Sequence, residues 1–354
     1  MLQLFTPKRP SFHHQASISH LLAYIRLLFH LNNSLEGASL SSRTTDVPGY
    51  PDPSMSELDQ RLQTHPGAPC ELLGELLRHL RSSLPGDFGW LREEAIEVSS
   101  DHPFDAGGTA DIFVGMMGDR KVAIKRYRLH SSSDYLPTYV RFYNEASVCS
   151  HFRNQSFVPF IGIYSTPEYP MCLIFEYMDH LNLKEYLRKN EHVGRRELLS
   201  EIACAVEHLH KMDVIHKNLK ITNVLVDADG HAHVGGFGAA FLPSATPGMD
   251  IDRFFHGAAP ELVGIQRFES VGTEATKATD IYAFGVLAWE VFAGQVPFSD
   301  KTKVAAVFSM WMGCRPTRPS RLSDCLWRMI EGCWRANPAR RVTIAEVVVA
   351  LEEE

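Results

Sequence analysis

A lysine and a glutamate in the middle of the chain are the first residues whose types and order could do chemistry together. Lys125 ends the β-rich run Val122-Ala123-Ile124-Lys125, and Glu145 follows downstream in a stretch with a helical pattern. An ammonium group at a strand end can contact phosphate oxygens, and a carboxylate on a helix can hold it in place. The sequence therefore predicts an ion pair between strand and helix, although many strands end in lysine.

Two polar segments further along carry the remaining candidates. His216-Lys217-Asn218-Leu219-Lys220-Ile221-Thr222-Asn223 leads into the apolar run Val224-Leu225-Val226, and Gly236-Phe237-Gly238 follows. Before them, the apolar run Leu173-Ile174-Phe175-Glu176-Tyr177-Met178 ends in a polar stretch. After them come Ala259-Pro260-Glu261, Asp280-Ile281-Tyr282-Ala283-Phe284-Gly285, Cys333-Trp334, Asn337-Pro338 and Arg341.

The elements that must position these residues change in type along the chain. Short β-rich runs dominate between about Ile96 and Met178, broken by one helical stretch from Tyr139 to Phe152. Long helical patterns dominate after Asn182. A small sheet-rich lobe followed by a larger helical lobe is an α+β arrangement.

In this order and spacing, the motifs resemble those of the protein kinase superfamily from about Ile96 to the C-terminus. The elements near the end are most similar to those of the tyrosine-kinase-like group. Each motif alone has a high false-positive rate, but the ordered series argues against a chance match. The resemblance implies a bilobal α+β fold with a small β-rich lobe and a larger helical lobe.

The resemblance also implies roles for individual residues. Lys125 would contact the α- and β-phosphates of ATP and would be held by Glu145. Lys220 would face the γ-phosphate, and Asn223 would bind one Mg²⁺ ion. The other residues of the implied nucleotide site are Gly107, Gly108, Ile112, Ala123, Phe175, Glu176, Met178 and Leu225.

Two positions depart from the family where the chemistry needs an acid. Asn218 stands where the family has its catalytic aspartate, and a carboxamide cannot accept a proton near neutral pH. Losing a general base typically costs about 10²–10⁴ in rate. Gly236 stands where the family has the metal-binding aspartate, so the main protein oxygen for Mg²⁺ is missing. The sequence therefore predicts little phosphotransfer and a doubtful Mg²⁺ site.

The glycine-rich loop over the phosphates is degenerate as well. The family's G-x-G-x-x-G reads Asp105-Ala106-Gly107-Gly108-Thr109-Ala110 in this chain. Asp105 and Asp111 are expected to bring negative charge close to the phosphates, which opposes their binding. These substitutions predict that ATP, if it binds, binds weakly.

The positions that hold the family's fold together are retained. By the resemblance, Glu261 and Arg341 form a buried ion pair, and Asp280 accepts backbone N–H groups of the segment around Asn218. Breaking a buried ion pair costs about 3–5 kcal/mol, so a folded domain needs these residues. His216, Phe237 and Cys149 are expected in a hydrophobic column that links the lobes.

Three functions remain open from the sequence. The first is a pseudokinase that serves as a scaffold or allosteric regulator of a protein partner such as an active kinase. The second is an active serine/threonine or tyrosine kinase with an atypical metal site that relies on Asn223 and Lys220. The third is a degenerate gene product without a maintained role.

Composition and charge exclude several other classes. The 354 residues carry a formal net charge of −7, which argues against bulk binding to nucleic acid or anionic membranes. Seven scattered cysteines without C-x-x-C spacing predict free thiols, a reducing compartment and no zinc site, which favours the cytoplasm.

The apolar stretch 18–31 is too short and too interrupted to span a bilayer. His231 and His233 alternate on a predicted strand and are expected to be exposed rather than to bind a metal.

The predicted organisation has four parts. Residues 1–40 are an extension with one candidate helix, and residues 41–70 are a linker rich in proline and serine. Residues 71–95 form an accessory helix with a leucine stripe, and residues 96–354 form the kinase-like domain.

Overall fold

The computed structural model of the chain describes residues 91–353 with several gaps. The gaps are 92–94, 100–101, 107–108, 129–137, 139–140, 143–144, 147, 151, 167–168, 170, 241–256 and 264–274. The segments predicted for 1–40 and 41–70, most of that for 71–95, and both loop glycines lie outside the described residues. The chain divides into two compact units, and the features below belong to the unit made of Gly89–Arg128 and Arg141–Glu354.

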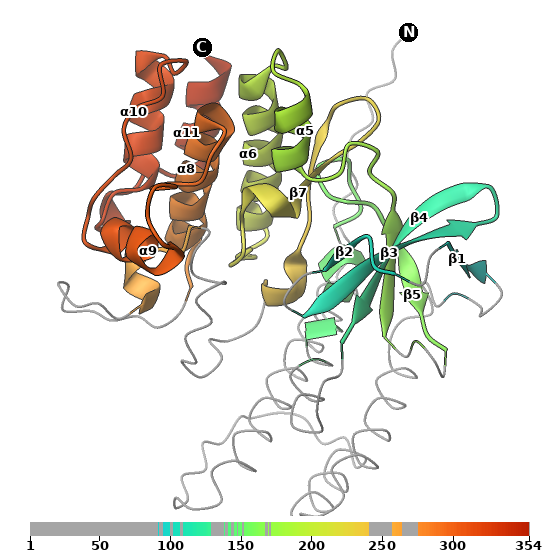
Figure 1. Cartoon of the computed structure of the whole chain (residues 1–354). Coiled ribbons are helices and arrows are strands. Elements are labelled where there is room, and N and C mark those ends of the chain that lie inside the picture. Colours follow the sequence, from blue (N-terminus) through green and yellow to red (C-terminus); the bar gives the residue numbers. More distant parts are fainter. Residues whose placement is uncertain are drawn as a thin grey trace, which may run out of the picture. The chain divides into compact units, whose positions relative to one another are not determined.

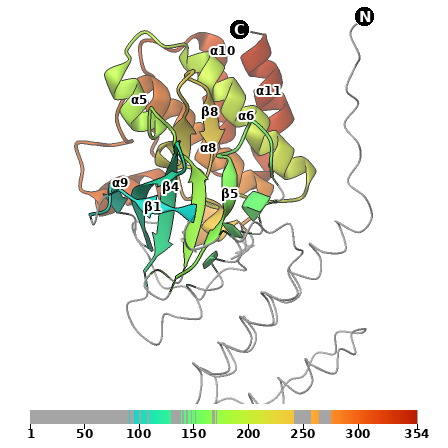
Figure 2. The ribbon, with the colours of Figure 1, turned by 90° about the vertical axis from the view of Figure 1, so that its right-hand side faces the viewer.

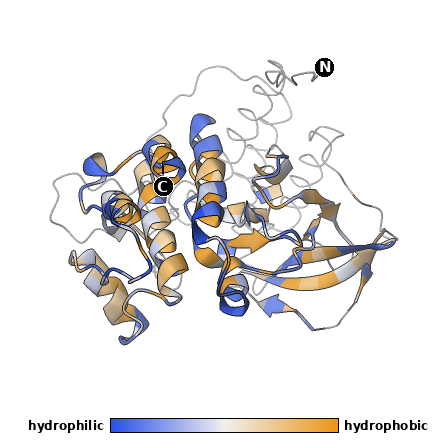
Figure 3. Ribbon diagram, turned by 90° about the horizontal axis from the view of Figure 1, so that it is seen from above, coloured by the Kyte–Doolittle hydropathy of each residue, from blue (hydrophilic) through white to orange (hydrophobic). Residues whose placement is uncertain are grey.

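An antiparallel sheet forms the small lobe of this unit (Figure 1). Its strands are ordered β1-β3-β4-β6-β5, and β2 pairs with β3. Their bounds are β1 Glu97–Val98, β2 Asp105–Ala106, β3 Ala110–Met117, β4 Arg120–Tyr127, β5 Phe160–Tyr164 and β6 Cys172–Glu176. Figure 3 shows that hydrophobic residues predominate along these strands, which agrees with a lobe built around one buried apolar cluster.

The register between β3 and β4 fixes the position of Lys125 in the sheet. Met117 pairs with Arg120, so only Gly118 and Asp119 connect the two strands. Gly118 has a φ of +60°, a conformation that tight hairpin turns need and that glycine adopts without steric cost. The same register sets Lys125 opposite Ile112. Helical residues around Glu145 pack on this sheet, and the Phe142 ring meets that of Tyr127 edge-on at 5.6 Å.

The large lobe is helical, and Figure 2 shows its helices at the opposite end of this unit from the sheet of the small lobe. Helix α8 is buried on nearly all sides and is the centre of this lobe. Its helices are α5 Leu183–Lys189, α6 Arg195–Lys211, α8 Lys277–Ala293, α9 Lys303–Trp311, α10 Asp324–Cys333 and α11 Ile344–Glu352. A second sheet pairs β7 (Val224–Val226) with β8 (Ala232–Val234), and short 3₁₀ turns span Ile221–Asn223, Phe237–Ala239, Pro260–Val263 and Pro338–Arg340. Within the described residues, no helix has the length and apolar character needed to cross a membrane.

Two buried polar contacts predicted from the sequence are present in the large lobe. Arg341 forms a two-bonded ion pair with the Glu261 carboxylate, at 2.6 and 2.8 Å. The Asp280 carboxylate on α8 accepts the backbone N–H groups of His216 and Lys217 at 2.8 and 2.9 Å. The predicted Glu261–Arg341 ion pair and the predicted acceptor role of Asp280 are therefore both confirmed.

Candidate functional site

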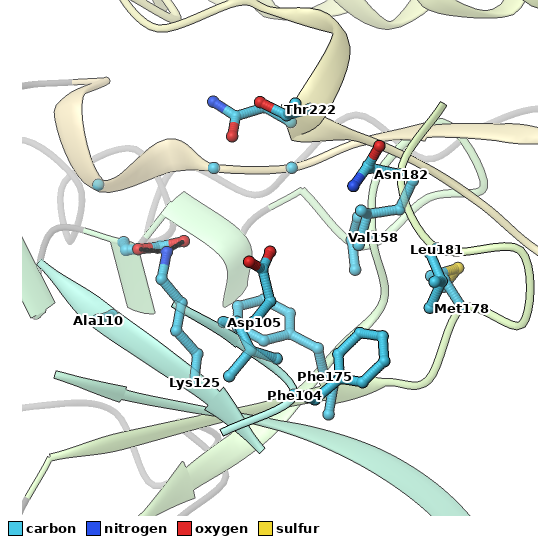
Figure 4. Close-up of a pocket in the computed structure, with 18 of the residues that line it drawn as sticks. Phe104, Asp105, Ala110, Lys125, Val158, Phe175, Met178, Leu181, Asn182 and Thr222 are labelled. Atoms are coloured by element: carbon cyan, nitrogen blue, oxygen red, sulfur yellow. Dashed lines mark hydrogen bonds and ion pairs between the residues drawn. The ribbon is translucent and has the colours of Figure 1, made fainter. Parts of the chain in front are cut away.

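A cleft of about 550 Å³ lies between the sheet of the small lobe and the segment that leads into β7. This volume is in the range of small-molecule sites. Among the described residues, the cleft brings together every site residue predicted from the sequence, as Figure 4 shows in part. These are Ile112, Ala123, Lys125, Glu145, Phe175, Glu176, Met178, Asn218, Lys220, Asn223 and Leu225.

The predicted ion pair is formed in the wall of the cleft. Lys125 Nζ lies 2.7 Å from both carboxylate oxygens of Glu145. The Tyr127 hydroxyl donates a hydrogen bond to Glu145 Oε2. The Glu145 side chain is almost fully buried, so three donors from two side chains offset its loss of hydration. Burial, followed by the nearby Glu145 charge, raises the pKa of Tyr127 well above its usual value and keeps the hydroxyl protonated.

The His216 ring holds the segment around Asn218 in place through hydrogen bonds. Its Nδ1 accepts the N–H of Asn218 at 3.2 Å, and its Nε2 lies 3.0 Å from the carbonyl oxygen of Gly235. Both hydrogen bonds are satisfied by a neutral ring that carries its proton on Nε2. Burial lowers the pKa of His216, which favours this neutral form. The ring lies 5.0 Å from that of Phe237, as predicted for the column between the lobes.

Asn223 and Gly236 fit against each other at the position where the family binds metal. Asn223 Nδ2 donates to the Asn218 carbonyl oxygen at 2.7 Å. Gly236 has a left-handed backbone, with φ of +81°. A Cβ atom on Gly236 would lie 2.7 Å from Asn223 Cγ and Nδ2. The Asn223 amide therefore fills the space that a side chain at position 236 would need.

The comparisons with known proteins agree with this geometry. The family described as protein tyrosine and serine/threonine kinase matches residues 105–351. The chain belongs to this protein kinase family. The predicted kinase family and the predicted bilobal fold are thereby confirmed.

Individual kinases match this chain at moderate identity. The serine/threonine/tyrosine-protein kinase HT1 of Arabidopsis thaliana is 29% identical over 262 residues, which cover 71% of this chain and 64% of HT1. The serine/threonine-protein kinase STY46 of the same plant is 26% identical over 258 residues, which cover 71% of this chain and 43% of STY46. The dual specificity protein kinase pyk3 of Dictyostelium discoideum is 26% identical over 265 residues, 72% of this chain and 18% of pyk3. The matched part is thus under two thirds of each relative.

Protein kinases generally use ATP together with Mg²⁺, and the side chains that the described residues place at this position do not fit the ion. Mg²⁺ requires near-octahedral oxygen ligands, with one or two carboxylates from the protein. Gly236 has no side-chain oxygen, and Asn223 offers one amide oxygen only. Among the described residues, no group of three or more histidine, cysteine, aspartate or glutamate side chains is arranged to hold a metal.

The same cleft does fit the base of a nucleotide. Its wall includes the apolar side chains of Ala123, Phe175, Met178 and Leu225. The Met178 carbonyl accepts the N–H of Leu181 at 3.0 Å, whereas the Met178 N–H makes no backbone hydrogen bond to any other described residue. A flat heteroaromatic ring with an acceptor could therefore lie between these walls.

Several residues of the cleft were missed by the sequence reasoning. Phe104 directly precedes the degenerate loop, and Asn182 caps α5 by accepting the N–H of Glu185 at 3.1 Å. Both had a local signal, a large apolar residue beside the loop and an N-cap residue before a helical pattern. Val158, Leu181 and Thr222 also line the cleft but carry no such local signal.

The two acidic residues near the loop differ in where they point, which corrects one prediction. Asp105 lines the cleft, and Figure 4 shows its carboxylate pointing into it. Asp111 is not part of the cleft wall, because successive side chains of a strand point to opposite faces and its neighbour Ile112 faces the cleft. Its carboxylate lies 3.8 Å from Arg126 and 3.7 Å from Arg128. The prediction that Asp111 brings negative charge close to the phosphates was wrong.

The prediction for the two strand histidines holds for one of them. His231 is exposed, with Nδ1 2.6 Å from Glu201, and this contact raises its pKa. His233 is buried, and its Nε2 lies 2.8 Å from Asp227. The expectation of exposure was wrong for His233 because the β7–β8 hairpin packs its ring against the Asp227 carboxylate.

Proposed function

We propose that this kinase-family domain transfers phosphate poorly or not at all and acts as a scaffold or allosteric regulator of a protein partner, such as an active kinase. One observation carries the proposal: an amide and a glycine occupy the positions of the catalytic base and the metal ligand, while the buried supports of both positions are intact. The supports are the Asp280 hydrogen bonds and the neutral His216 ring.

The chemistry of the two positions supports a large loss of rate. Asn218 cannot take the proton of a hydroxyl substrate, a loss that typically costs about 10²–10⁴. Gly236 offers no carboxylate, so this position lacks the ligand that would hold a metal ion beside the phosphates and supply positive charge there. ATP binding in this proposal is weak and has no firm requirement for Mg²⁺.

A phosphotransfer assay tests the proposal. The full chain is incubated with radiolabelled ATP, generic protein substrates and either Mg²⁺ or Mn²⁺, beside the Lys125→Met variant. We expect incorporation no higher than that of Lys125→Met. Robust turnover that Lys125→Met abolishes would contradict the proposal.

Restoring both acids is the converse test, and the position of the Asn223 side chain affects it. Asn218→Asp with Gly236→Asp should raise the phosphotransfer rate if the rest of the site is sound. The Asn223 amide must first move, because it occupies the space beside Gly236. No gain in rate would mean that the loop or lobe closure is also impaired.

An active kinase with an atypical metal site is the alternative, and two observations favour it. The Lys125–Glu145 ion pair is formed, as an active kinase needs, and relatives of this chain carry names of serine/threonine, tyrosine and dual specificity kinases. In that case Lys220 and Asn223 would hold the phosphates and the ion. The assay above separates the two functions.

We also propose a cytoplasmic location. The cysteines of the described residues are free thiols, and two of them, Cys204 and Cys314, are exposed. Unpaired exposed thiols are typical of a reducing compartment.

A further inference from the structure

We propose that Tyr127 is a positioning residue whose hydroxyl anchors Glu145, and the helical residues around it, to the sheet of the small lobe independently of Lys125 and of any nucleotide. The inference rests on the proposed function and concerns its regulation: a scaffold held by its own side chains presents the same small lobe to a partner whether the cleft is empty or occupied. It is carried by the contacts around the buried Glu145 carboxylate.

Tyr127 joins the sheet to the helical residues at two points. Its backbone is fixed in the sheet, because it pairs with Ala110 of β3 and its N–H donates to the Met171 carbonyl oxygen at 3.0 Å. Its ring meets the Phe142 ring edge-on at 5.6 Å, and its hydroxyl donates to Glu145 Oε2. Phe142 and Glu145 are three positions apart, a spacing that places both on the same side of a helix. One tyrosine side chain thus holds this side of the helical stretch against β4.

The two donors to Glu145 differ in how far they are committed to it. The Lys125 ammonium has three donor hydrogens on a side chain that is 21% exposed, so it can serve a ligand in the cleft and Glu145 at once. The Tyr127 hydroxyl has one donor hydrogen, which goes to Glu145, and the residue is buried. Hydrogen bonds are stronger where water is excluded. Tyr127 therefore provides an anchor that ligand binding at Lys125 leaves in place.

Gly238 extends this contact to the segment that follows β8. A Cβ atom on Gly238 would lie 3.1 Å from Glu145 Oε2 and 3.3 Å from the Tyr127 hydroxyl oxygen, so the backbone here packs directly against the hydrogen-bonded pair. Gly238 lies in the 3₁₀ turn that begins with Phe237, whose ring meets that of His216 at 5.0 Å. The Tyr127–Glu145 pair is thus enclosed by β4, the helical residues and this turn.

Hydrogen–deuterium exchange of the full chain without nucleotide tests the inference. It is read by mass spectrometry in peptides that contain Ala146, Val148 and Cys149, which are buried in the same helical stretch. Tyr127→Phe removes the hydroxyl and keeps both the ring and the ion pair. We expect exchange in these peptides to rise about tenfold, because a buried hydrogen bond to a charged group is lost.

A second background tests independence from the ion pair. Lys125→Met combined with Glu145→Gln removes the whole ion pair and leaves no unpaired charge buried, while the amide oxygen at position 145 still accepts the Tyr127 hydrogen bond. Adding Tyr127→Phe to this background should raise exchange about fivefold, because the amide then loses its donor. No further rise would mean that the ion pair alone holds the helical residues and would overturn the inference.

A matched tyrosine and a nucleotide series complete the test. Tyr282 on α8 is buried, and its hydroxyl makes no hydrogen bond to any described residue, so Tyr282→Phe should change exchange in the same peptides by less than about twofold. ATP with Mg²⁺ should likewise leave the parent chain unchanged within about twofold. An effect of Tyr282→Phe as large as that of Tyr127→Phe, or a tenfold slowing by ATP, would overturn the inference. Phosphotransfer in the assay above would instead refute the proposed function, and the exchange data would still show which side chain holds Glu145.

Discussion

The segment around His216 has two sides that differ in what they retain. On the side that faces α8, Asp280 accepts two backbone N–H groups and lies 3.0 Å from His210 Nε2. On the side that faces the cleft, Asn218 and Gly236 replace the two acids of an active kinase, and Asn223 fills part of the space between them. Buried polar groups cost stability when they are lost, whereas groups at the cleft surface cost mainly chemistry. This difference between the two sides agrees with the proposed function, in which the fold is retained and phosphotransfer is not.

The largest expected effect is on the α8 side. Asp280→Ala should lower the free energy of unfolding by about 3–5 kcal/mol, because it leaves two backbone donors and the His210 ring buried without their acceptor. Urea denaturation followed by circular dichroism measures the change. Asp229→Ala in the exposed turn before β8 is the control and should change stability by less than about 0.5 kcal/mol. A loss for Asp280→Ala as small as the control would break the comparison, because the α8 side would then carry no more stability than the surface.

A second buried acid on α8 sharpens the comparison, because its environment differs from that of Asp280. Burial raises the pKa of Glu290 to about 8, against a smaller opposing effect of Lys184. The folded state therefore holds a proton that the unfolded state releases between the ordinary glutamate pKa and about pH 8. Since the folded state binds more protons in this range, stability should fall as the pH rises through it and level off above it.

Glu290→Gln should remove this pH dependence. We expect the variant to be as stable as the parent near pH 5 and more stable by about 1–3 kcal/mol at pH 8, since each pKa unit is worth about 1.4 kcal/mol and relaxation reduces the effect. Urea denaturation at pH 5, 6.5 and 8 measures it. If the difference between variant and parent were the same at all three pH values, Glu290 would be ionised in the folded state.

The sequence predicted the parts of the site that motifs specify in order along the chain. The Lys125–Glu145 pair, the acceptor role of Asp280 and the Glu261–Arg341 pair were all assigned this way. The direction of Asp111 could also have been predicted, since Ile112 was placed toward the nucleotide and adjacent strand residues face opposite ways. The Tyr127–Glu145 hydrogen bond, the burial of His233 and the positions of Val158 and Leu181 depend on how separate elements pack, which no local pattern encodes.

The smallest expected effect is a coupling energy, and it tests the contact between Asn223 and Gly236 on the cleft side. Gly236→Ala should destabilise the domain by about 1–3 kcal/mol, because a Cβ costs about 1–2 kcal/mol at this backbone conformation and also meets the Asn223 amide. Gly118→Ala is the matched control. Its φ is +60° and nothing lies within 4 Å of its Cβ position, so it should show the backbone cost alone.

A double-mutant cycle then isolates the packing contribution. Asn223→Ala removes the atoms that a Cβ at position 236 would meet, so Gly236→Ala should cost about 1 kcal/mol less in that background than in the parent. Urea denaturation of the four variants provides the coupling energy. A coupling near zero, with Gly236→Ala no worse than Gly118→Ala, would mean that the Asn223 amide moves aside freely. In that case an aspartate at position 236 would fit beside Asn223. The Asn223 side chain would then not prevent the restoration of this acid.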